Sequence, residues 1–425
     1  MNRRWQLCSV AAACVLAAHM AAQDLSVASP ESVGLSSERL ARIGAAVDRS
    51  IQEKRIAGAV TLVARHGHVV WLKAQGMLDR EAGKPMPTDA IFRICSMSKP
   101  ITSLAVMMLY EHGRFLLDDP VSKYIPEFKN PRVLVHPAAG PSYTIPAKRE
   151  ITIRNLLTHT SGITYQWNPE LGQMYKDANV ASGLLAYDGT IGDSVKRLAA
   201  LPLLFNPGER FEYSLGVDVL GYLVEVLSGE TFDQFLRTRI FNPLAMRDTS
   251  FYPPEEKLGR LAAVYTWYPE KGLRRFPDAP IVEGPFAYSA DYPYHGPKKL
   301  YSGGAGLCST AMDYARFCQL MLNHGKAGSR RLISRKTVEL MTSDQLGKIE
   351  PDQAFGLGFG IDGVKAPLAE LGSPGEFNWG GFYYTAFVID PKEDMITIFM
   401  AQLHPAGDLN LDRMIHVLAC QAIND

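Results

Sequence analysis

The sequence has no excess charge of either sign. Its 425 residues include 44 Lys and Arg and 44 Asp and Glu, so the formal net charge is zero at pH 7. A nucleic-acid partner normally requires a basic surface, and none is expected here. The chain also lacks a linker rich in Pro, Gly or Ser, a charge run, an internal repeat and a low-complexity tract. These absences favour one large domain.

Signatures of metal and cofactor sites are missing as well. No HExxH, Walker A or flanked GxGxxG motif is present, so we expect no metal and no cofactor. No Gly-x-Ser-x-Gly elbow occurs, the nearest sequence being residues 192–196, and this disfavours an α/β-hydrolase triad. Four cysteines follow the N-terminal segment and form no Cys-x-x-Cys pair. We expect buried free thiols at Cys95, Cys308, Cys318 and Cys420. The spacings of these cysteines leave disulfide bonds open as an alternative.

Only the N-terminus carries a long apolar run. Residues 1–4 are basic, residues 5–22 are apolar and rich in alanine, and polarity returns at residue 23. This order is typical of a secretory signal peptide with cleavage after Ala22, a membrane anchor or a lipid site at Cys14 being the alternatives. Residues 23–425 would then form a periplasmic or secreted domain without a membrane span.

Hydrophobic periodicity predicts helices and strands in a definite order. At the front, a helix follows Ser36, and a hairpin joins strands at 59–64 and 69–75. Helical spacing marks the middle of the chain at residues 96–113, 154–159, 216–228, 232–241 and 309–322. Strands and a closing helix are predicted at the back, at residues 355–361, 377–379, 383–389, 395–401 and 409–423. The fold class is therefore α/β (α+β), with both ends building one sheet (about 35–90 and 335–425) around a helical subdomain (about 96–330).

Ser96 and Lys99 form the one Ser-x-x-Lys sequence in the chain. At helical spacing their Cβ atoms would be roughly 5–6 Å apart on one face, so the amine can approach the hydroxyl. A serine with an unshifted pKa is a poor nucleophile and needs such a neighbour. The pattern alone is expected about once by chance in a chain of this composition.

Three later stretches change the meaning of this pair. Residues 156–162 read Leu-Leu-Thr-His-Thr-Ser-Gly, residues 207–215 read Pro-Gly-Glu-Arg-Phe-Glu-Tyr-Ser-Leu, and residues 378–382 read Asn-Trp-Gly-Gly-Phe. In this order, the chain from about Leu35 to Ile423 resembles the serine β-lactamase and penicillin-binding-protein superfamily. More narrowly it is similar to the class C β-lactamase-like esterases, the family VIII carboxylesterases. The resemblance implies a β-lactamase/transpeptidase-like fold, with an antiparallel sheet flanked by helices.

The resemblance also implies roles for individual residues. Ser96 would attack the carbonyl carbon and become acylated, and a desolvated Lys99 would take or relay its proton. Tyr213 matches the tyrosine of the family's Tyr-x-Asn element and would pass a proton to the leaving alcohol. Whether Lys99 or Tyr213 is the base stays open, and we treat them as one coupled pair. By analogy, the backbone N–H groups of Ser96 and Phe382 would form the oxyanion hole.

Two departures from the family pattern bear on the substrate. Trp379-Gly380-Gly381 aligns with the Lys-Thr-Gly strand of β-lactamases, so a neutral indole replaces a cation. Leu215 stands where Tyr-x-Asn has its asparagine, which removes an amide. Both changes favour uncharged esters over β-lactams or D-Ala-D-Ala peptides. An apolar pocket, or else ordinary packing, is expected of Tyr165, Trp167, Tyr383, Tyr384 and the aromatic segment 286–301.

The sequence as a whole predicts an exported serine carboxylesterase for short to medium acyl esters. The alternatives are a β-lactamase or a D-amino-acid-specific peptidase on the same fold, and a non-catalytic penicillin-binding-like sensor. The expected partner is a small-molecule ester, and no oligomeric state is predicted. His159 is expected to be a buried, satisfied histidine, and Asp218 and Glu209 are expected to be solvated or capping residues.

Overall fold

The computed structural model describes residues 25–425, and the predicted signal peptide therefore lies outside the described residues. Its centre is a nine-stranded mixed sheet in the order β1-β3-β2-β19-β18-β17-β16-β15, with β4 paired to β3. The pairs are antiparallel except for β1 and β3, which run parallel. The strands of this sheet are β1 (Ser26–Val27), β2 (Gly58–Arg65), β3 (His68–Asp79), β4 (Lys84–Pro85), β15 (Ala354–Phe355), β16 (Gly360–Ile361), β17 (Phe377–Gly381), β18 (Thr385–Asp390) and β19 (Met395–Met400).

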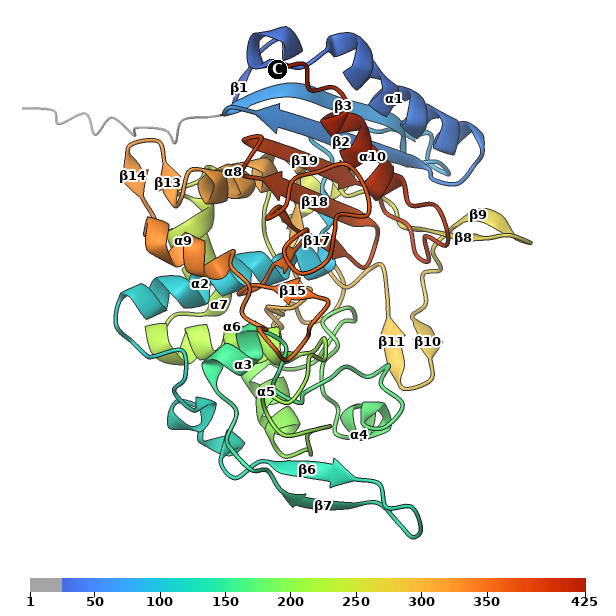
Figure 1. Cartoon of the computed structure of the whole chain (residues 1–425). Coiled ribbons are helices and arrows are strands. Elements are labelled where there is room, and N and C mark those ends of the chain that lie inside the picture. The colour runs from blue at the N-terminus through green and yellow to red at the C-terminus, as the bar shows by residue number, and fades with distance from the viewer. Residues whose placement is uncertain (1–24) are drawn as a thin grey trace, which may run out of the picture.

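Both ends of the chain build the sheet, as the sequence predicts. Strand β2 from the front pairs along its length with β19 from the back, from Val60 opposite Met400 to Arg65 opposite Met395. Figure 1 shows this junction where the blue and red strands meet. Every residue of both strands is buried, so helices must cover both faces of the sheet.

Strand β19 divides its side chains between two cores. Ile396 and Ile398 belong to the larger core on the side of α2 and α8, whereas Met395 and Phe399 belong to the smaller core under α1 and α10. This alternation follows from the period of two in a strand. The α-helices are α1 (Ser37–Gln52), α2 (Ser98–Glu111), α3 (Ile153–Leu157), α4 (Gly172–Asp177), α5 (Ile191–Ala199), α6 (Gly216–Ser228), α7 (Phe232–Leu236), α8 (Ala311–Leu322), α9 (Arg335–Met341) and α10 (Leu411–Cys420).

Several local predictions are confirmed. Ser36 caps α1 by accepting a hydrogen bond from the Arg39 N–H at 3.2 Å. The β2–β3 hairpin turns at His66 and Gly67, whose positive φ angles of 52° and 75° suit a two-residue hairpin turn. The four cysteines after the N-terminal segment are all free, and three of them are buried.

Other local predictions are wrong in detail. The single strand predicted over 355–361 is two short strands, β15 and β16, because the chain turns between them and Gly358 has a φ of 95°. On α10, which the sequence predicts as the closing helix, Met414 is 48% exposed, although helical spacing places it on one face with the buried Leu411 and Ile415. His416 is buried on that helix instead, since a buried carboxylate, Glu376, satisfies it.

The helical part lies below the sheet in Figure 1, with α2 running through the core. Twelve of the fourteen residues of α2 are buried, and the helix packs against α6. In the described residues no helix has the length and apolar character needed to cross a bilayer. The remaining strands form two-stranded pairs: β5 (Phe92–Arg93) with β12 (Cys308–Ser309), β6 (Arg132–Val135) with β7 (Tyr143–Pro146), β8 (Tyr265–Tyr268) with β9 (Gly272–Arg275), β10 (Ile281–Glu283) with β11 (Phe286–Tyr288), and β13 (Lys326–Ala327) with β14 (Arg330–Arg331).

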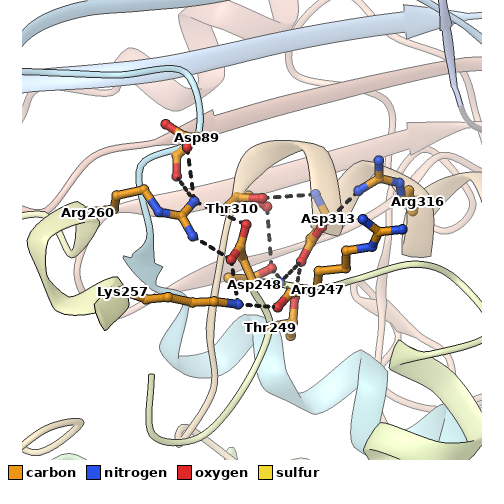
Figure 2. A network of polar contacts seen from close by, with 10 residues as sticks. Asp89, Arg247, Asp248, Thr249, Lys257, Arg260, Thr310, Asp313 and Arg316 are labelled. Atoms are coloured by element: carbon orange, nitrogen blue, oxygen red, sulfur yellow. Dashed lines mark hydrogen bonds and ion pairs between the residues drawn. The ribbon is translucent and has the colours of Figure 1, made fainter. Parts of the chain in front are cut away.

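A polar network fixes the start of α8 to the segment around residue 248 (Figure 2). The Asp313 carboxylate accepts hydrogen bonds from the Asp248 N–H at 2.7 Å and the Thr249 hydroxyl at 3.0 Å. Asp248 pairs in turn with Lys257 at 2.9 Å and with Arg260. The long irregular stretch that follows residue 250 is therefore anchored at its beginning.

Candidate active site

Ser96 lies in a 3₁₀ turn, Cys95–Met97, between strand β5 and helix α2. The prediction of a helix beginning near Ser96 is thus correct to within two residues. The turn is held from both sides, because the Ile94 N–H donates to the Leu307 carbonyl at 3.0 Å and the Tyr314 hydroxyl donates to the Met97 carbonyl at 2.9 Å. Ser96 itself is half-buried, so its hydroxyl lies at the surface of a rigid support.

Lys99 lies one turn along and is only 1% exposed. Its Nζ is 3.3 Å from Ser96 Oγ. It also contacts the Tyr165 hydroxyl oxygen at 2.9 Å and the Gly304 carbonyl oxygen at 2.8 Å. The first contact follows from helical spacing, whereas the other two partners come from segments 66 and 205 residues away. Three acceptors therefore surround the Lys99 nitrogen.

Tyr213 presents the face of its ring to the same amine. Lys99 Nζ lies 4.4 Å from the ring centroid of Tyr213. The ring also packs against Tyr165 and Trp379, each with a centroid distance of 5.5 Å. The structure thus brings Ser96, Lys99, Tyr213 and Trp379 into one cluster, although they are spread over almost 300 residues of sequence.

His159 is fully buried beside this cluster, as expected, but it is not fully satisfied, because within the described residues its Nε2 has no hydrogen-bond partner. The Ser214 N–H donates to its Nδ1 at 3.2 Å, and its ring lies 4.8 Å from that of Tyr213. Burial, with a smaller effect from the charge of Lys99, holds the pKa of His159 well below its ordinary value. A neutral imidazole that accepts a backbone hydrogen bond fits a structural role.

Asp218 is not solvated, and that expectation is wrong. It lies in the first turn of α6, is 9% exposed, and its Oδ1 accepts a hydrogen bond from the Ser302 hydroxyl at 2.6 Å. Burial raises the pKa of its carboxyl, and the opposing effects of Ser302 and Lys99 only partly cancel this. An acidic residue in the first turn of a helix is ordinarily an exposed residue that interacts with the helix dipole. The sequence therefore gave little indication that Asp218 is buried. Glu209 is a turn residue at the surface, as expected.

Strand β17 meets the turn that carries Ser96 at Gly381. A Cβ atom there would clash with the Ile94 carbonyl oxygen and the Thr385 hydroxyl, so only glycine allows the strand so close. Phe382, the next residue, stacks on His404 with a centroid distance of 3.8 Å. The end of β17 therefore abuts the turn that carries Ser96, which is the arrangement that the predicted oxyanion pair requires.

Four aromatic side chains, Tyr165, Trp167, Phe286 and Phe382, form a continuous series that we call the aromatic wall. Tyr165 stacks on Trp167 at 4.0 Å between centroids, and Trp167 contacts Phe286 edge to face at 5.0 Å. Phe286, on strand β11, lies 5.9 Å from Phe382. The wall runs from the Lys99 side of the cluster to the end of β17.

Some predicted pocket residues lie outside this series. Leu215 is 1% exposed and Tyr383 is fully buried, with its hydroxyl donating to the Ser289 carbonyl at 2.8 Å. Tyr384 packs on Phe399, and its hydroxyl accepts from the Leu411 N–H. Gly380 is open, because a Cβ atom there would meet only the Thr385 carbonyl oxygen at 3.4 Å. Residues 25–425 contain no group of three or more side chains placed to hold a metal ion.

Comparisons with known proteins agree with this geometry. A family model described as Beta-lactamase matches residues 43–421. Esterase EstB of Burkholderia gladioli is 35% identical over 359 residues, covering 82% of this chain and 87% of EstB. Protein Rv1367c of Mycobacterium tuberculosis (strain ATCC 25618 / H37Rv) is 34% identical over 374 residues, covering 84% and 88%. Among solved structures, EstCE1, described as a hydrolase with promiscuous acyltransferase activity, has a TM-score of 0.76 at 28% identity, covering 91% of this chain and 99% of EstCE1.

Proposed function

Because this chain belongs to the beta-lactamase family and is a serine hydrolase of that family, we propose that it is a carboxylesterase acting through an acyl-enzyme on Ser96. The observation that carries the proposal is the 3.3 Å contact between Lys99 Nζ and Ser96 Oγ beside the ring of Tyr213. A serine needs an adjacent group that can handle its proton, and these two residues supply one.

In the proposed reaction, Ser96 Oγ bonds to the ester carbonyl carbon and its proton passes to the coupled Lys99 and Tyr213 pair. The carbonyl electrons move onto oxygen, and the N–H groups of Ser96 and Phe382 stabilise that oxyanion. When the carbonyl reforms, the C–O bond to the alcohol breaks and the alcohol takes the proton. Water then attacks the acyl carbon in the same way, releasing the acid and restoring Ser96.

The proposed substrates are uncharged esters with short to medium acyl chains. Trp379 contributes a neutral indole at the position that resembles the lysine of the Lys-Thr-Gly strand of β-lactamases, so this strand offers no cation for a carboxylate. The aromatic wall supplies apolar surface beside the nucleophile, which suits an alkyl acyl group. Esterase activity in EstB and hydrolase activity in EstCE1 support the same class of reaction.

The proposal predicts that Ser96→Ala abolishes hydrolysis of p-nitrophenyl butyrate. Wild-type enzyme quenched during turnover should gain the mass of one butyryl group, and peptide mapping should locate it on Ser96. Ser329→Ala, which changes an exposed serine without a side-chain hydrogen bond, is the matched control and should behave as wild type. Activity retained in Ser96→Ala would move the nucleophile elsewhere.

A substrate panel separates an esterase from a β-lactamase or a D-amino-acid peptidase. We expect kcat/KM for p-nitrophenyl butyrate to exceed the values for benzylpenicillin and for a D-Ala-D-Ala peptide by about 100-fold or more, since each missing charge-assisted contact costs roughly 1.5–3 kcal/mol. The opposite ranking would overturn the assignment as an esterase.

Export is a separate proposal, supported by the basic, apolar and polar order of residues 1–24. The mature protein in the periplasm or culture medium should begin at Gln23. A cytoplasmic protein that keeps Met1 would contradict it.

A further inference from the structure

We propose that Asp218 is a positioning residue for Lys99: its buried carboxylate, packed on Gly304, holds the Lys99 amine in place and directed at Ser96. The proposal rests on the proposed function only in taking Ser96 as the nucleophile. The positions of Asp218 and Lys99, and the electrostatic attraction between them, do not depend on the reaction.

The surroundings of Lys99 fit an ammonium. A lysine ammonium has three N–H donors, and three oxygen atoms surround Nζ: those of the Ser96 hydroxyl, the Tyr165 hydroxyl and the Gly304 carbonyl. The face of the Tyr213 ring, 4.4 Å away, also favours a cation. At 1% exposure, however, Lys99 cannot be stabilised by bulk water, so a buried charge here requires an opposite charge nearby.

The titratable side chains that face Lys99 come from the nucleophile turn, the 159–165 loop, the 211–215 segment and α6, and they are Cys95, His159, Tyr165, Tyr213 and Asp218. Burial raises the pKa of Cys95 to about 11 and holds the pKa of Tyr165 well above its ordinary value. The pKa of His159 is held low. These three side chains are therefore neutral near pH 7. Asp218 is the carboxylate in this set, and the charge of Lys99 lowers its pKa against the effect of burial.

Asp218 also fixes the position of the carbonyl that Lys99 contacts. The Ser302 hydroxyl donates to Asp218 Oδ1 at 2.6 Å and accepts a hydrogen bond from the Ala305 N–H at 3.2 Å. A Cβ atom at Gly304 would lie 2.5 Å from Asp218 Oδ2, so the carboxylate packs directly on the Gly304 backbone. Within the described residues, Oδ2 is buried and has no well-formed hydrogen bond. Asp218 Oδ1 therefore orients the turn at residues 302–305 through Ser302. Asp218 Oδ2 faces the backbone of Gly304, whose carbonyl oxygen contacts Lys99.

A stability cycle tests the charge pairing without using activity. Asp218→Asn leaves a buried ammonium and Lys99→Met leaves a buried carboxylate, so each single variant should lower Tm. The double variant removes both charges and should melt above either single variant. If the Tm losses of the two single variants simply add in the double variant, the proposal is wrong. If Asp218→Asn alone fails to fold, the Tm of the double variant compared with that of Lys99→Met still tests the proposal. Because no turnover is measured, this result stands apart from the outcome of the Ser96 test.

The pH dependence of kcat provides a readout that a structural role would not move. In Asp218→Asn, the pH profile of kcat should shift to lower pH, because the proton-handling pair loses the buried carboxylate beside it. We expect kcat to fall about 10- to 100-fold with KM changed less than about threefold, as for a misplaced proton-handling group. An unshifted profile would assign Asp218 a structural role and reject the proposal.

Asp313→Asn is the matched control. Asp313 is 3% exposed, lies in the first turn of α8, and accepts hydrogen bonds from Asp248 and Thr249 (Figure 2). Its variant should lower Tm, since it weakens the network, but it should leave the pH profile in place. Lys99→Met should not rescue it. If the pH profile of Asp313→Asn shifted as far as that of Asp218→Asn, loss of any buried aspartate would be enough to cause the shift. That result would contradict the proposal.

Discussion

Two adjacent glycines of strand β17, Gly380 and Gly381, look equivalent in the sequence but differ in their surroundings. A side chain at Gly381 would clash with Ile94 and Thr385, whereas one at Gly380 would make an ordinary contact with the Thr385 backbone. The difference arises because Gly381 lies against the turn that carries Ser96. At the residue scale, the distance between the strand and that turn is set by the missing Cβ atom of Gly381.

Gly381→Ala should therefore separate β17 from the turn that carries Ser96. We expect kcat/KM for p-nitrophenyl butyrate to fall by about 100-fold, because a displacement of about 1 Å in an active site costs this much. The variant should also lower Tm. Gly380→Ala is the structural comparison and should keep a Tm close to that of wild type. Equal Tm values for the two variants would contradict the close approach.

At the scale of elements, the β10–β11 hairpin supplies one member of the aromatic wall. Phe286 lies on β11, is 3% exposed, and links Trp167 to Phe382. Strand β11 begins the segment 286–301, for which the sequence predicted an apolar pocket or else ordinary packing, but the sequence did not single out Phe286 among the aromatic residues of that segment. Phe286 is identified as a member of the aromatic wall only by its contact with Trp167, which lies 119 residues earlier in the chain.

Phe286→Ala should interrupt the aromatic wall and open space between Trp167 and Phe382. The ratio of kcat/KM for p-nitrophenyl decanoate to that for p-nitrophenyl butyrate should rise by about 10-fold or more, in the range that a few methylene groups contribute in an apolar pocket. A ratio of rates is insensitive to the fraction of folded enzyme. Val282→Ala, on β10 of the same hairpin and 61% exposed, is the control. An unchanged ratio in Phe286→Ala would remove Phe286 from the acyl pocket.

At the scale of the whole molecule, the last helix is joined to the active-site strand by a buried pair. His416 Nε2 on α10 lies 3.2 Å from Glu376 Oε2, and Glu376 is the residue that precedes β17. Both side chains are less than 10% exposed. Burial lowers the pKa of His416, but hydrogen bonds with Cys420 and Glu376 outweigh this and raise it to about 10. The folded protein therefore holds a proton that the unfolded chain, with a histidine pKa near 6.5, releases.

This pair predicts a loss of stability at alkaline pH. The contribution of His416 is fully present below about pH 6.5 and is lost as pH rises toward 10, with a slope of about 1.4 kcal/mol per pH unit. Urea unfolding of wild type and His416→Gln from pH 6 to pH 10 should show this slope only in wild type. His136→Gln removes an exposed histidine that pairs with Glu170, and it should keep the wild-type slope. A wild-type slope in His416→Gln would contradict the assignment.

The sequence by itself determined the features that depend on local spacing. Helix and strand periodicity predicted the β2–β3 hairpin and the helices that follow Ser96 and Tyr213, and helical spacing brought Lys99 to Ser96. The order of the motifs along the chain was enough to identify the family, because those residue types recur together. None of these inferences required knowledge of which distant segments touch.

The tertiary structure alone decided which polar groups are buried together. Ser302 and Asp218 are 84 residues apart, and Gly304 is 205 residues from Lys99, so no local pattern could show that they surround one amine. The same holds for His416, which is buried on α10 while Met414 is exposed, because Glu376 lies where it can pair with the imidazole. A buried charge is stable only beside its partner, and the partner is brought there by the fold.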